Sequence, residues 1–232
     1  MNKTLSFLQK RKYELLLMAL VQHLFIGIFL KDMDFYTDVV WPINMLILGI
    51  SSVGVYVETS RWRNLTKNFL FLLVLLLPFS LSFIGQVPHF MSLLSLCYML
   101  FFIFVFFEVM RYLVKPSYIN ADTISASACG YLLLIEIGVF LLQFLFYYDS
   151  TSFTGIDLMS HATVLMDLIY FCSITMTSIG YGDITPHAHY MKLITAAFGI
   201  VGQFYSVVLV GVLISKFASQ NYNDKTHRSN TK

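Results

Sequence analysis

Six long hydrophobic segments, separated by short polar stretches, set the pattern of the chain. They cover about residues 13–30, 40–57, 68–87, 90–114, 124–148 and 190–217. A helix that crosses a bilayer needs roughly 17–25 mainly apolar residues, so each segment is long enough to span a membrane. A further stretch at about 160–177 is shorter and more mixed in polarity, which favours a re-entrant helix held among the others.

The composition supports lipid as the solvent for most of the chain. Of the 232 residues, 57% are hydrophobic and only 12% are charged. A soluble domain of this size could not bury that much apolar surface. The sequence therefore predicts an all-α integral membrane protein with six transmembrane helices in a lipid bilayer.

The distribution of Lys and Arg predicts the orientation of the chain. With the N-terminus inside, only Lys31 and Lys192 of the 15 basic residues fall on the outer side. Because basic residues concentrate in cytoplasmic loops, we expect a multi-pass plasma-membrane protein with cytoplasmic N- and C-termini. The outer segments carry acidic side chains that would enrich cations near a pore mouth. They are Asp32, Asp34, Asp38, Asp149, Asp157 and Asp183.

A polar, glycine-rich stretch, TMTSIGYGDITP at 175–186, lies between the re-entrant stretch and the last span. Backbone that is not helical is tolerated at membrane depth only where it is buried in protein or lines a water-filled path. Gly180 and Gly182 permit positive φ angles, so successive carbonyl oxygens can turn toward one line. A row of carbonyl oxygens can replace the water shell of a dehydrated cation.

The order of residues in this stretch resembles the selectivity filter of potassium channels: threonine, aliphatic, glycine, tyrosine, glycine, then aspartate. The runs NADTISASACGYLLL and GQFYSVVLVGVLIS resemble bacterial channels with a two-transmembrane pore module (Ion_trans_2-like). The resemblance covers about residues 119–218. The alternative, a chance Gly-Tyr-Gly in an outer turn, does not account for the ordered match between two spans.

The resemblance implies roles for individual residues. The filter, which would bind K⁺, consists of Ser178, Ile179, Gly180, Tyr181 and Gly182, with K⁺ contacts from the carbonyls of Ser178, Ile179, Gly180 and Tyr181 and from the Ser178 hydroxyl. Its supporting residues are Thr175, Thr177, Asp183, Tyr170 and Phe171, the last two as an aromatic cuff on the re-entrant helix.

Ser178 departs from the family pattern, which has threonine at this innermost position. Serine keeps the hydroxyl but lacks the methyl that restricts χ1. We expect selectivity to survive with a looser inner ion site. Because one chain supplies one loop and a closed ring of carbonyls needs four, the resemblance implies a homotetramer.

Three regions follow from this division of the chain. Residues 1–118 would form a four-helix N-terminal membrane domain, 119–218 the pore domain, and 219–232 a disordered cytoplasmic tail. The first domain occupies the position that a voltage sensor has in other channels. A sensor needs several basic residues in its fourth span, and this span has only Arg111. Because Glu108 lies three residues earlier on the same helix, the pair is typical of a helical salt bridge. We therefore predict little voltage dependence. Asp122 is expected to cap the fifth span.

Two residues are candidates for gating. Gly202 is either a hinge of the last span or a close-packing point between helices. Glu136, near the middle of the fifth span, is either a structural group that holds helices together or part of a pH-sensitive gate. His23 in the first span is more typical of a packed polar contact than of a sensor.

Passive, potassium-selective conduction is the function that these observations favour, with K⁺ as the permeant ion and no cofactor. A non-selective cation channel and a non-conducting auxiliary subunit are the alternatives. A symporter would carry four filter-like loops in one chain, and only one occurs here. We expect neither an enzyme nor a nucleic-acid partner, and the sequence does not identify a gating ligand.

Overall fold

A computed structural model describes residues 11–56, 72, 76–77, 89–114 and 120–230, with side chains described up to residue 211. Five of its helical segments are long and apolar enough to cross a membrane. They are Lys12–Phe29, Met33–Val53, Phe90–Val114, Ala121–Tyr148 and His189–Gly211. The predicted third span at 68–87 lies outside the described residues except for residues 72, 76 and 77. The all-α membrane fold is thus confirmed, and the count of six spans stays a prediction.

The N-terminal region forms two helical rods. The first is α2 (Lys12–Phe25), continued by the 3₁₀ turn η1 (Ile26–Phe29). The second runs through α3 (Met33–Phe35), η2 (Tyr36–Val40), α4 (Trp41–Val53) and η3 (Gly54–Tyr56). The predicted spans at 13–30 and 40–57 fall on these rods.

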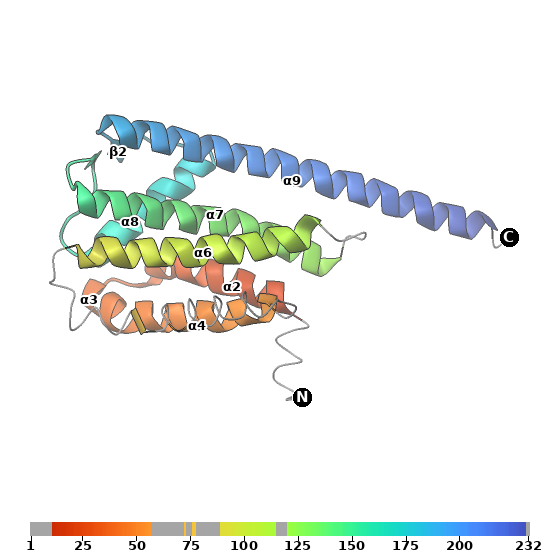
Figure 1. The fold of residues 1–232 in the computed structure, drawn as a ribbon, viewed down its shortest axis with the longest axis horizontal. Coiled ribbons are helices and arrows are strands. Elements are labelled where there is room, and N and C mark those ends of the chain that lie inside the picture. The colour runs from red at the N-terminus through yellow and green to blue at the C-terminus, as the bar shows by residue number, and fades with distance from the viewer. Residues whose placement is uncertain (1–10, 57–71, 73–75, 78–88, 115–119, 231–232) are drawn as a thin grey trace.

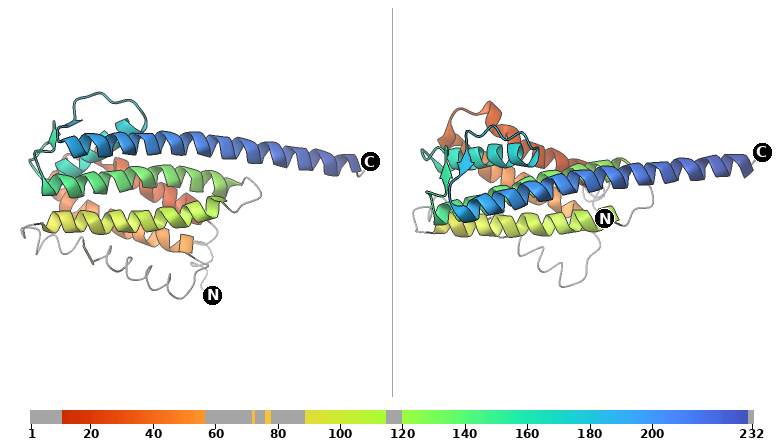
Figure 2. Two further views of the ribbon diagram at one scale, coloured as in Figure 1. Left: turned by 45° about the horizontal axis from the view of Figure 1, so that its top comes forward. Right: turned by 90° about the horizontal axis from the view of Figure 1, so that it is seen from above.

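Helix α7 (Ala121–Tyr148) lies at the centre of the molecule. It contacts α6 (Phe90–Val114), α2, α8 (His161–Met176) and α9 (His189–Asn230). Figure 1 shows α6, α7 and α9 side by side, with α2 and α4 on the opposite side of α6 and α7 from α9. The views in Figure 2 keep the same neighbours, and α8 packs against both α7 and α9 at one end of the bundle.

Local side chains set where the pore-region helices begin. The Asn120 side chain accepts hydrogen bonds from the Thr123 amide at 2.9 Å and from the Thr123 hydroxyl at 2.8 Å, so it caps α7. The prediction that Asp122 caps this helix was wrong, because Asp122 already lies within its first turn. Helix α8 begins at a capping box formed by Ser160 and Thr163.

Helix α9 is longer than the sequence pattern predicted. It continues to Asn230, so the segment from residue 219 is helical where a disordered tail was expected. Residues 212–230 contain neither Gly nor Pro, the residues that most strongly end a helix. The C-terminal part of α9 therefore extends beyond the rest of the bundle (Figure 1).

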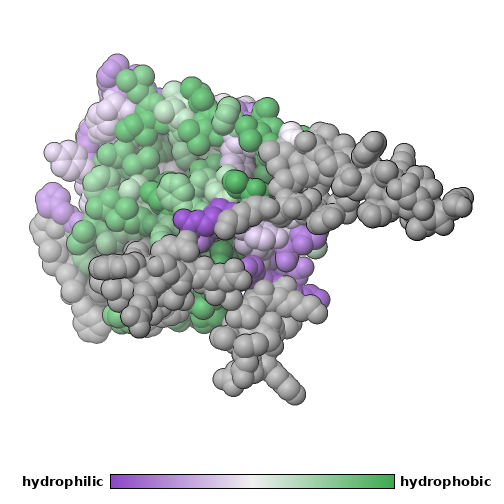
Figure 3. Space-filling model, turned by 45° about the vertical axis from the view of Figure 1, so that its right-hand side comes forward, coloured by the Kyte–Doolittle hydropathy of each residue, from purple (hydrophilic) through white to green (hydrophobic). Residues whose placement is uncertain are grey.

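The described surface is largely apolar. In Figure 3 hydrophobic residues cover most of the visible body, and hydrophilic residues gather mainly at its margins. Large side chains such as Met18, Leu100 and Phe107 are 69%, 48% and 61% exposed. Such an exterior suits contact with lipid or with other apolar helices, because exposed apolar patches of this extent are unusual on soluble monomers.

Candidate ion-conduction site

The filter segment 177–183 is held between α8 and α9. Helix α8 ends at Met176, and after the filter Thr185–Pro186 (β2) pairs antiparallel with Phe153–Thr154 (β1). The His187 amide also donates to the Ser152 carbonyl at 2.7 Å. The chain that leaves the filter is thereby tied to the loop between α7 and α8, so both ends of the segment are fixed.

The backbone of the filter alternates in handedness. The φ angle is 60° at Ser178, 55° at Gly180 and 82° at Gly182, whereas Ile179 and Tyr181 between them do not have positive φ. Such alternation turns successive carbonyl oxygens toward one side of the chain, which an ordinary pleated strand does not do. A row of this kind is suited to coordinate a dehydrated cation.

Amide hydrogens of the filter are bound to the end of α8. The Ile174 carbonyl accepts from the Ile179 amide at 2.8 Å and from the Gly180 amide at 3.2 Å. The Ser178 amide donates to the Thr175 carbonyl at 3.1 Å. Within the described part of the chain no hydrogen bond reaches the carbonyl oxygens of residues 178–181. These oxygens are therefore available to an ion.

Tyr170 braces the outer half of the filter. Its hydroxyl donates to Asp183 Oδ2 at 2.7 Å, and its ring lies parallel to that of Tyr181, with centroids 6.4 Å apart and a 4° angle between planes. This hydrogen bond lowers the pKa of the Asp183 carboxyl below its ordinary value. Phe171, the other cuff residue, instead packs edge-on against Phe153, away from these contacts.

The two predicted threonines have different surroundings. The Thr177 hydroxyl donates back to the Ser173 carbonyl at 2.7 Å, so it is engaged within the last turn of α8. Thr175 lines a crevice of about 690 Å³ between α8 and α9, together with Ser178, Gly199 and Gln203.

Gln203 of α9 is a filter contact that sequence reasoning missed. Its Nε2 atom lies 2.5 Å from Ser178 Oγ and 3.3 Å from the Met176 carbonyl oxygen. The isolated polar residue in the apolar run of the last span was the available signal, but its partner 25 positions earlier depends on how α9 packs.

Gly202 lies at a close approach of α9 to α8. A Cβ atom added there would be 2.7 Å from Cε and 3.1 Å from Cγ of Met176. The absence of a side chain at Gly202 therefore allows the two helices to pack this closely, as expected for a close-packing glycine. The hinge role stays a proposal.

Glu136 pairs with His23. Both side chains are fully buried, and Glu136 Oε1 lies 2.7 Å from His23 Nδ1. Their other polar atoms, Glu136 Oε2 and His23 Nε2, have no hydrogen-bond partner among the described residues. The pair links α2 of the N-terminal region to α7 of the pore region. The sequence identified both residues but did not predict that they meet.

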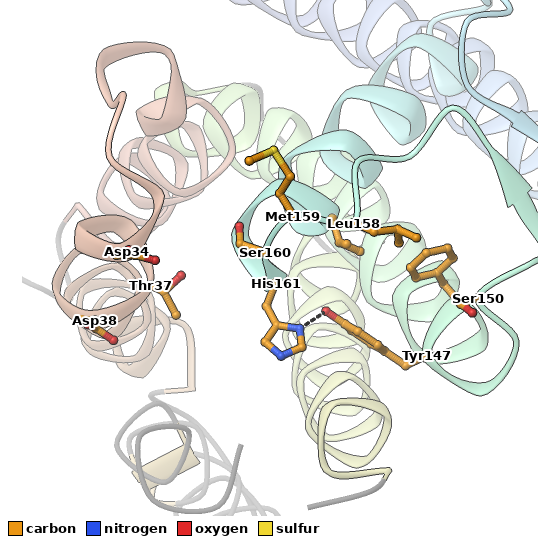
Figure 4. Close-up of a pocket in the computed structure, with 11 residues that line it drawn as sticks. Asp34, Thr37, Asp38, Tyr147, Ser150, Leu158, Met159, Ser160 and His161 are labelled. Carbon is orange, nitrogen blue, oxygen red and sulfur yellow. Dashed lines mark hydrogen bonds between the residues drawn. The ribbon is translucent and has the colours of Figure 1, made fainter. Parts of the chain in front are cut away.

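A pocket of about 420 Å³ lies between the segment that contains Asp34 and Asp38 and the helices α7 and α8 (Figure 4). Asp34 and Asp38 lie on one side, and His161 and Tyr147 on the other, with His161 Nδ1 2.8 Å from the Tyr147 hydroxyl. Burial lowers the pKa of the His161 imidazole, since the charged form of the ring loses contact with water. The pocket lies beside the N-terminus of α8, not at the filter.

Residues 133–219 match the ion channel family Ion_trans_2. This range holds most of α7, all of α8, the filter segment and the membrane-spanning part of α9. These are the elements that the family model matches.

Curated relatives of the chain include potassium channels. Two pore potassium channel b of Oryza sativa subsp. japonica is 36% identical over 84 residues, 35% of this chain and 23% of the rice protein. Two-pore potassium channel 5 of Arabidopsis thaliana is 31% identical over 100 residues, 43% of this chain and 22% of that protein. Potassium voltage-gated channel subfamily KQT member 4 of Homo sapiens is 35% identical over 99 residues, 43% of this chain and 13% of the human protein. The resemblance to the potassium channel family is therefore confirmed.

These matches cover part of this chain and a smaller part of each relative. The chain spans under a quarter of the length of these three relatives, and no solved structure matches it significantly. A multi-pass membrane channel, as opposed to an enzyme, is the coarse assignment that the matches support. The bacterial type of the resemblance stays a prediction.

Proposed function

We propose that the protein is a potassium-selective channel that conducts K⁺ passively through a pore formed by four copies of the chain. The observation that carries the proposal is the alternating backbone of residues 178–182, in which the carbonyl oxygens of residues 178–181 accept no hydrogen bond from the described residues. In this proposal the carbonyls of Ser178, Ile179, Gly180 and Tyr181 bind K⁺, helped by the Ser178 hydroxyl. Gly182 completes the alternation, and Tyr170 and Asp183 hold the outer end.

The exposure of the filter supports a homotetramer. In a single chain Ile179 is 54% and Tyr181 72% exposed, although non-helical backbone at membrane depth requires protein around it. The neighbouring face of α9 is also apolar and open, with Ile200, Phe204 and Val207 each 70% exposed. Further copies of the chain would cover both surfaces and close the ring of carbonyls. Closed cyclic symmetry is usual for such assemblies.

We propose weak or absent voltage dependence. In α6, Arg111 Nη1 lies 2.7 Å from Glu108 Oε1, so the salt bridge predicted for this pair is confirmed. Each charge that crosses the field contributes only about 2.3 kcal/mol per 100 mV, and a charge paired with a neighbour on the same helix carries little net charge with it. Recording conductance between −100 and +100 mV, for wild type and Arg111→Gln, tests this: a steep wild-type curve would contradict it.

The remaining assignments belong to the same proposal. The chain would lie in the plasma membrane with both termini cytoplasmic, which places the filter exit at Asp183 on the outer side. Glu136 and Gly202 are the candidate gating residues.

Ion flux from purified protein in liposomes tests the central claim. Liposomes loaded with K⁺ are diluted into Na⁺, and the K⁺ efflux and the reverse Na⁺ flux are measured separately. We expect K⁺ flux to exceed Na⁺ flux by at least about tenfold in wild type, equivalent to about 1.4 kcal/mol of discrimination. Equal fluxes would assign a non-selective cation channel. No flux over a range of pH and voltage would favour a non-conducting subunit.

A further inference from the structure

The side chain of Gln203 reaches the innermost residue of the filter. Its Nε2 atom lies 2.5 Å from Ser178 Oγ and 3.3 Å from the Met176 carbonyl oxygen. A carbonyl oxygen can only accept, so the NH₂ end of the amide must face this point. The two amide hydrogens then serve two acceptors, the Ser178 hydroxyl and the Met176 carbonyl.

Ser178 needs such a contact more than a threonine would. Serine lacks the β-methyl that restricts χ1, so its hydroxyl is free to rotate among staggered rotamers. Its backbone is also in the left-handed region, with φ of 60°, which is uncommon for a residue other than glycine. A hydrogen bond from another helix supplies the restraint that the serine side chain does not supply by itself.

We propose that Gln203 is a positioning residue of the selectivity filter. It holds the Ser178 hydroxyl in the one rotamer that completes the innermost site for a dehydrated monovalent cation, and it thereby contributes to discrimination between K⁺ and Na⁺. Because the hydroxyl accepts from Gln203, its own hydrogen and one lone pair remain, and the lone pair can face the ion. This inference rests on the proposed function of the filter.

An amide is suited to this position. It donates two hydrogen bonds without a net charge, and a full charge at membrane depth is costly. Gln203 is on α9 and Ser178 follows α8, so the hydrogen bond also links the last span to the ion site. A change in how α9 packs against α8 would therefore reach the inner filter through this side chain.

Substitution of Gln203 in the full-length protein tests the inference by the ratio of K⁺ to Na⁺ flux in liposomes. Gln203→Met keeps the length of the side chain and removes both donors. We expect the flux ratio to fall at least about fivefold, since every copy of the chain loses its hydrogen bond to Ser178 and one such bond alone corresponds to about this factor. Ser178→Thr introduced into Gln203→Met should restore the ratio, because the added methyl restricts χ1 directly. Gln203→Asn, which keeps the amide but shortens the side chain, serves as a second variant if the first does not assemble.

Gln22→Met is the matched control. Gln22 Nε2 donates to Asn44 Oδ1 at 3.0 Å between α2 and α4, so this control also removes an interhelical amide hydrogen bond, but away from the filter. Its flux ratio should equal that of wild type. An unchanged ratio in Gln203→Met, or an equal fall in the control, would overturn the inference. A fall in total flux with an unchanged ratio of K⁺ to Na⁺ flux would also overturn the inference, because it would indicate that Gln203 has only a structural role.

Thermal stability separates failure of this inference from failure of the proposed function. A ligand that binds the folded state raises Tm, so K⁺ should stabilise the purified oligomer more than Na⁺ does. If K⁺ raises the Tm of wild type more than Na⁺ does but no flux is seen, the conduction proposal fails. In that case the inference about Gln203 stands only if Gln203→Met reduces the difference between the Tm in K⁺ and the Tm in Na⁺. If wild type shows neither selective flux nor K⁺-specific stabilisation, both fail.

Discussion

Two polar sites within the apolar body of this protein, the filter segment and the His23–Glu136 pair, are built in opposite ways. At the filter they are backbone carbonyls of consecutive residues, open on the surface of the single chain. Between α2 and α7 they are two side chains 113 positions apart, His23 and Glu136, sealed from solvent. The filter is suited to exchange ions with water, whereas the buried pair is suited to hold two helices together.

The two sites therefore depend on different features of the structure. The filter needs particular backbone angles, so its residues are restricted by conformation. The His23–Glu136 pair needs mutual contact, since a buried polar group left without a partner is costly. Substitutions that change only the backbone conformation of the filter, or only the contact between His23 and Glu136, therefore test the comparison.

The largest effect should come from Gly180→Ala. Nothing lies within 4 Å of a Cβ added at Gly180, so the cost is the left-handed backbone, φ 55°, and not a clash. At about 1–2 kcal/mol per copy, four copies lose roughly 4–8 kcal/mol, so we expect K⁺ flux to fall by about a thousandfold or more. Liposome flux measures this.

Gly211→Ala is the control for that variant. Gly211 also has nothing within 4 Å of an added Cβ, but it lies in helical backbone of α9. Its flux should remain near the wild-type value. If K⁺ flux falls by a comparable factor in both variants, the loss in Gly180→Ala does not come from the left-handed backbone at Gly180.

Glu136→Ala should destabilise the protein by about 3 kcal/mol, because it leaves His23 buried without a partner. Glu136→Gln keeps a group able to bond with His23 and should cost less. The Tm of the purified protein measures both. Equal Tm values for wild type and Glu136→Ala would contradict the structural role of the pair.

The same residue allows a test of gating. Flux is measured against pH for wild type and Glu136→Gln. Coincident pH curves would remove Glu136 from the gate, leaving it with a structural role alone. A shifted curve at unchanged Tm would instead support a pH-sensitive gate.

Gly202→Ala should have a smaller effect, about 1 kcal/mol of stability, because the added methyl group meets the flexible end of Met176. Met176→Ala removes the contacting side chain but is itself destabilising, because Met176 is fully buried. In the double variant the loss in Tm should therefore be smaller than the sum of the two single losses. If flux changes in Gly202→Ala while Tm does not, and the two substitutions are additive, the packing interpretation is wrong and the hinge is favoured.

Tyr170→Phe should shift the acid sensitivity of the filter. The Tyr170 hydroxyl keeps the pKa of Asp183 low, so its contribution is present above the ordinary Asp pKa and is lost as pH falls through the lowered value. Without the hydroxyl the Asp183 pKa rises. The pH at which K⁺-selective flux is half lost should therefore move upward.

Tyr190→Phe provides the comparison for this shift. It removes a similar hydrogen bond, from Tyr190 to Asp149 Oδ2 at 3.0 Å, outside the filter. The pH at which its K⁺-selective flux is half lost, its acid midpoint, should match that of wild type. A Tyr170→Phe midpoint that stays in place, or moves downward, would show that Asp183 does not limit the acid stability of the filter.

The sequence by itself determined the spans that the structure describes and the short apolar helix at His161–Met176. Spans follow from the length of apolar runs, and the residues proposed for the filter are readable because their chemistry lies in the backbone of consecutive residues. The resemblance to potassium channels named Tyr170 and Asp183 as supporting residues, and the structure shows the hydrogen bond between them.

Only the tertiary structure decided which distant polar groups meet. Gln203 with Ser178, His23 with Glu136, and the packing of Gly202 on Met176 all join separate helices. In a membrane helix most faces are apolar, so hydrophobic periodicity does not fix which face turns toward which neighbour. That choice is made by the packing of whole helices, and with it the partners of the few polar side chains.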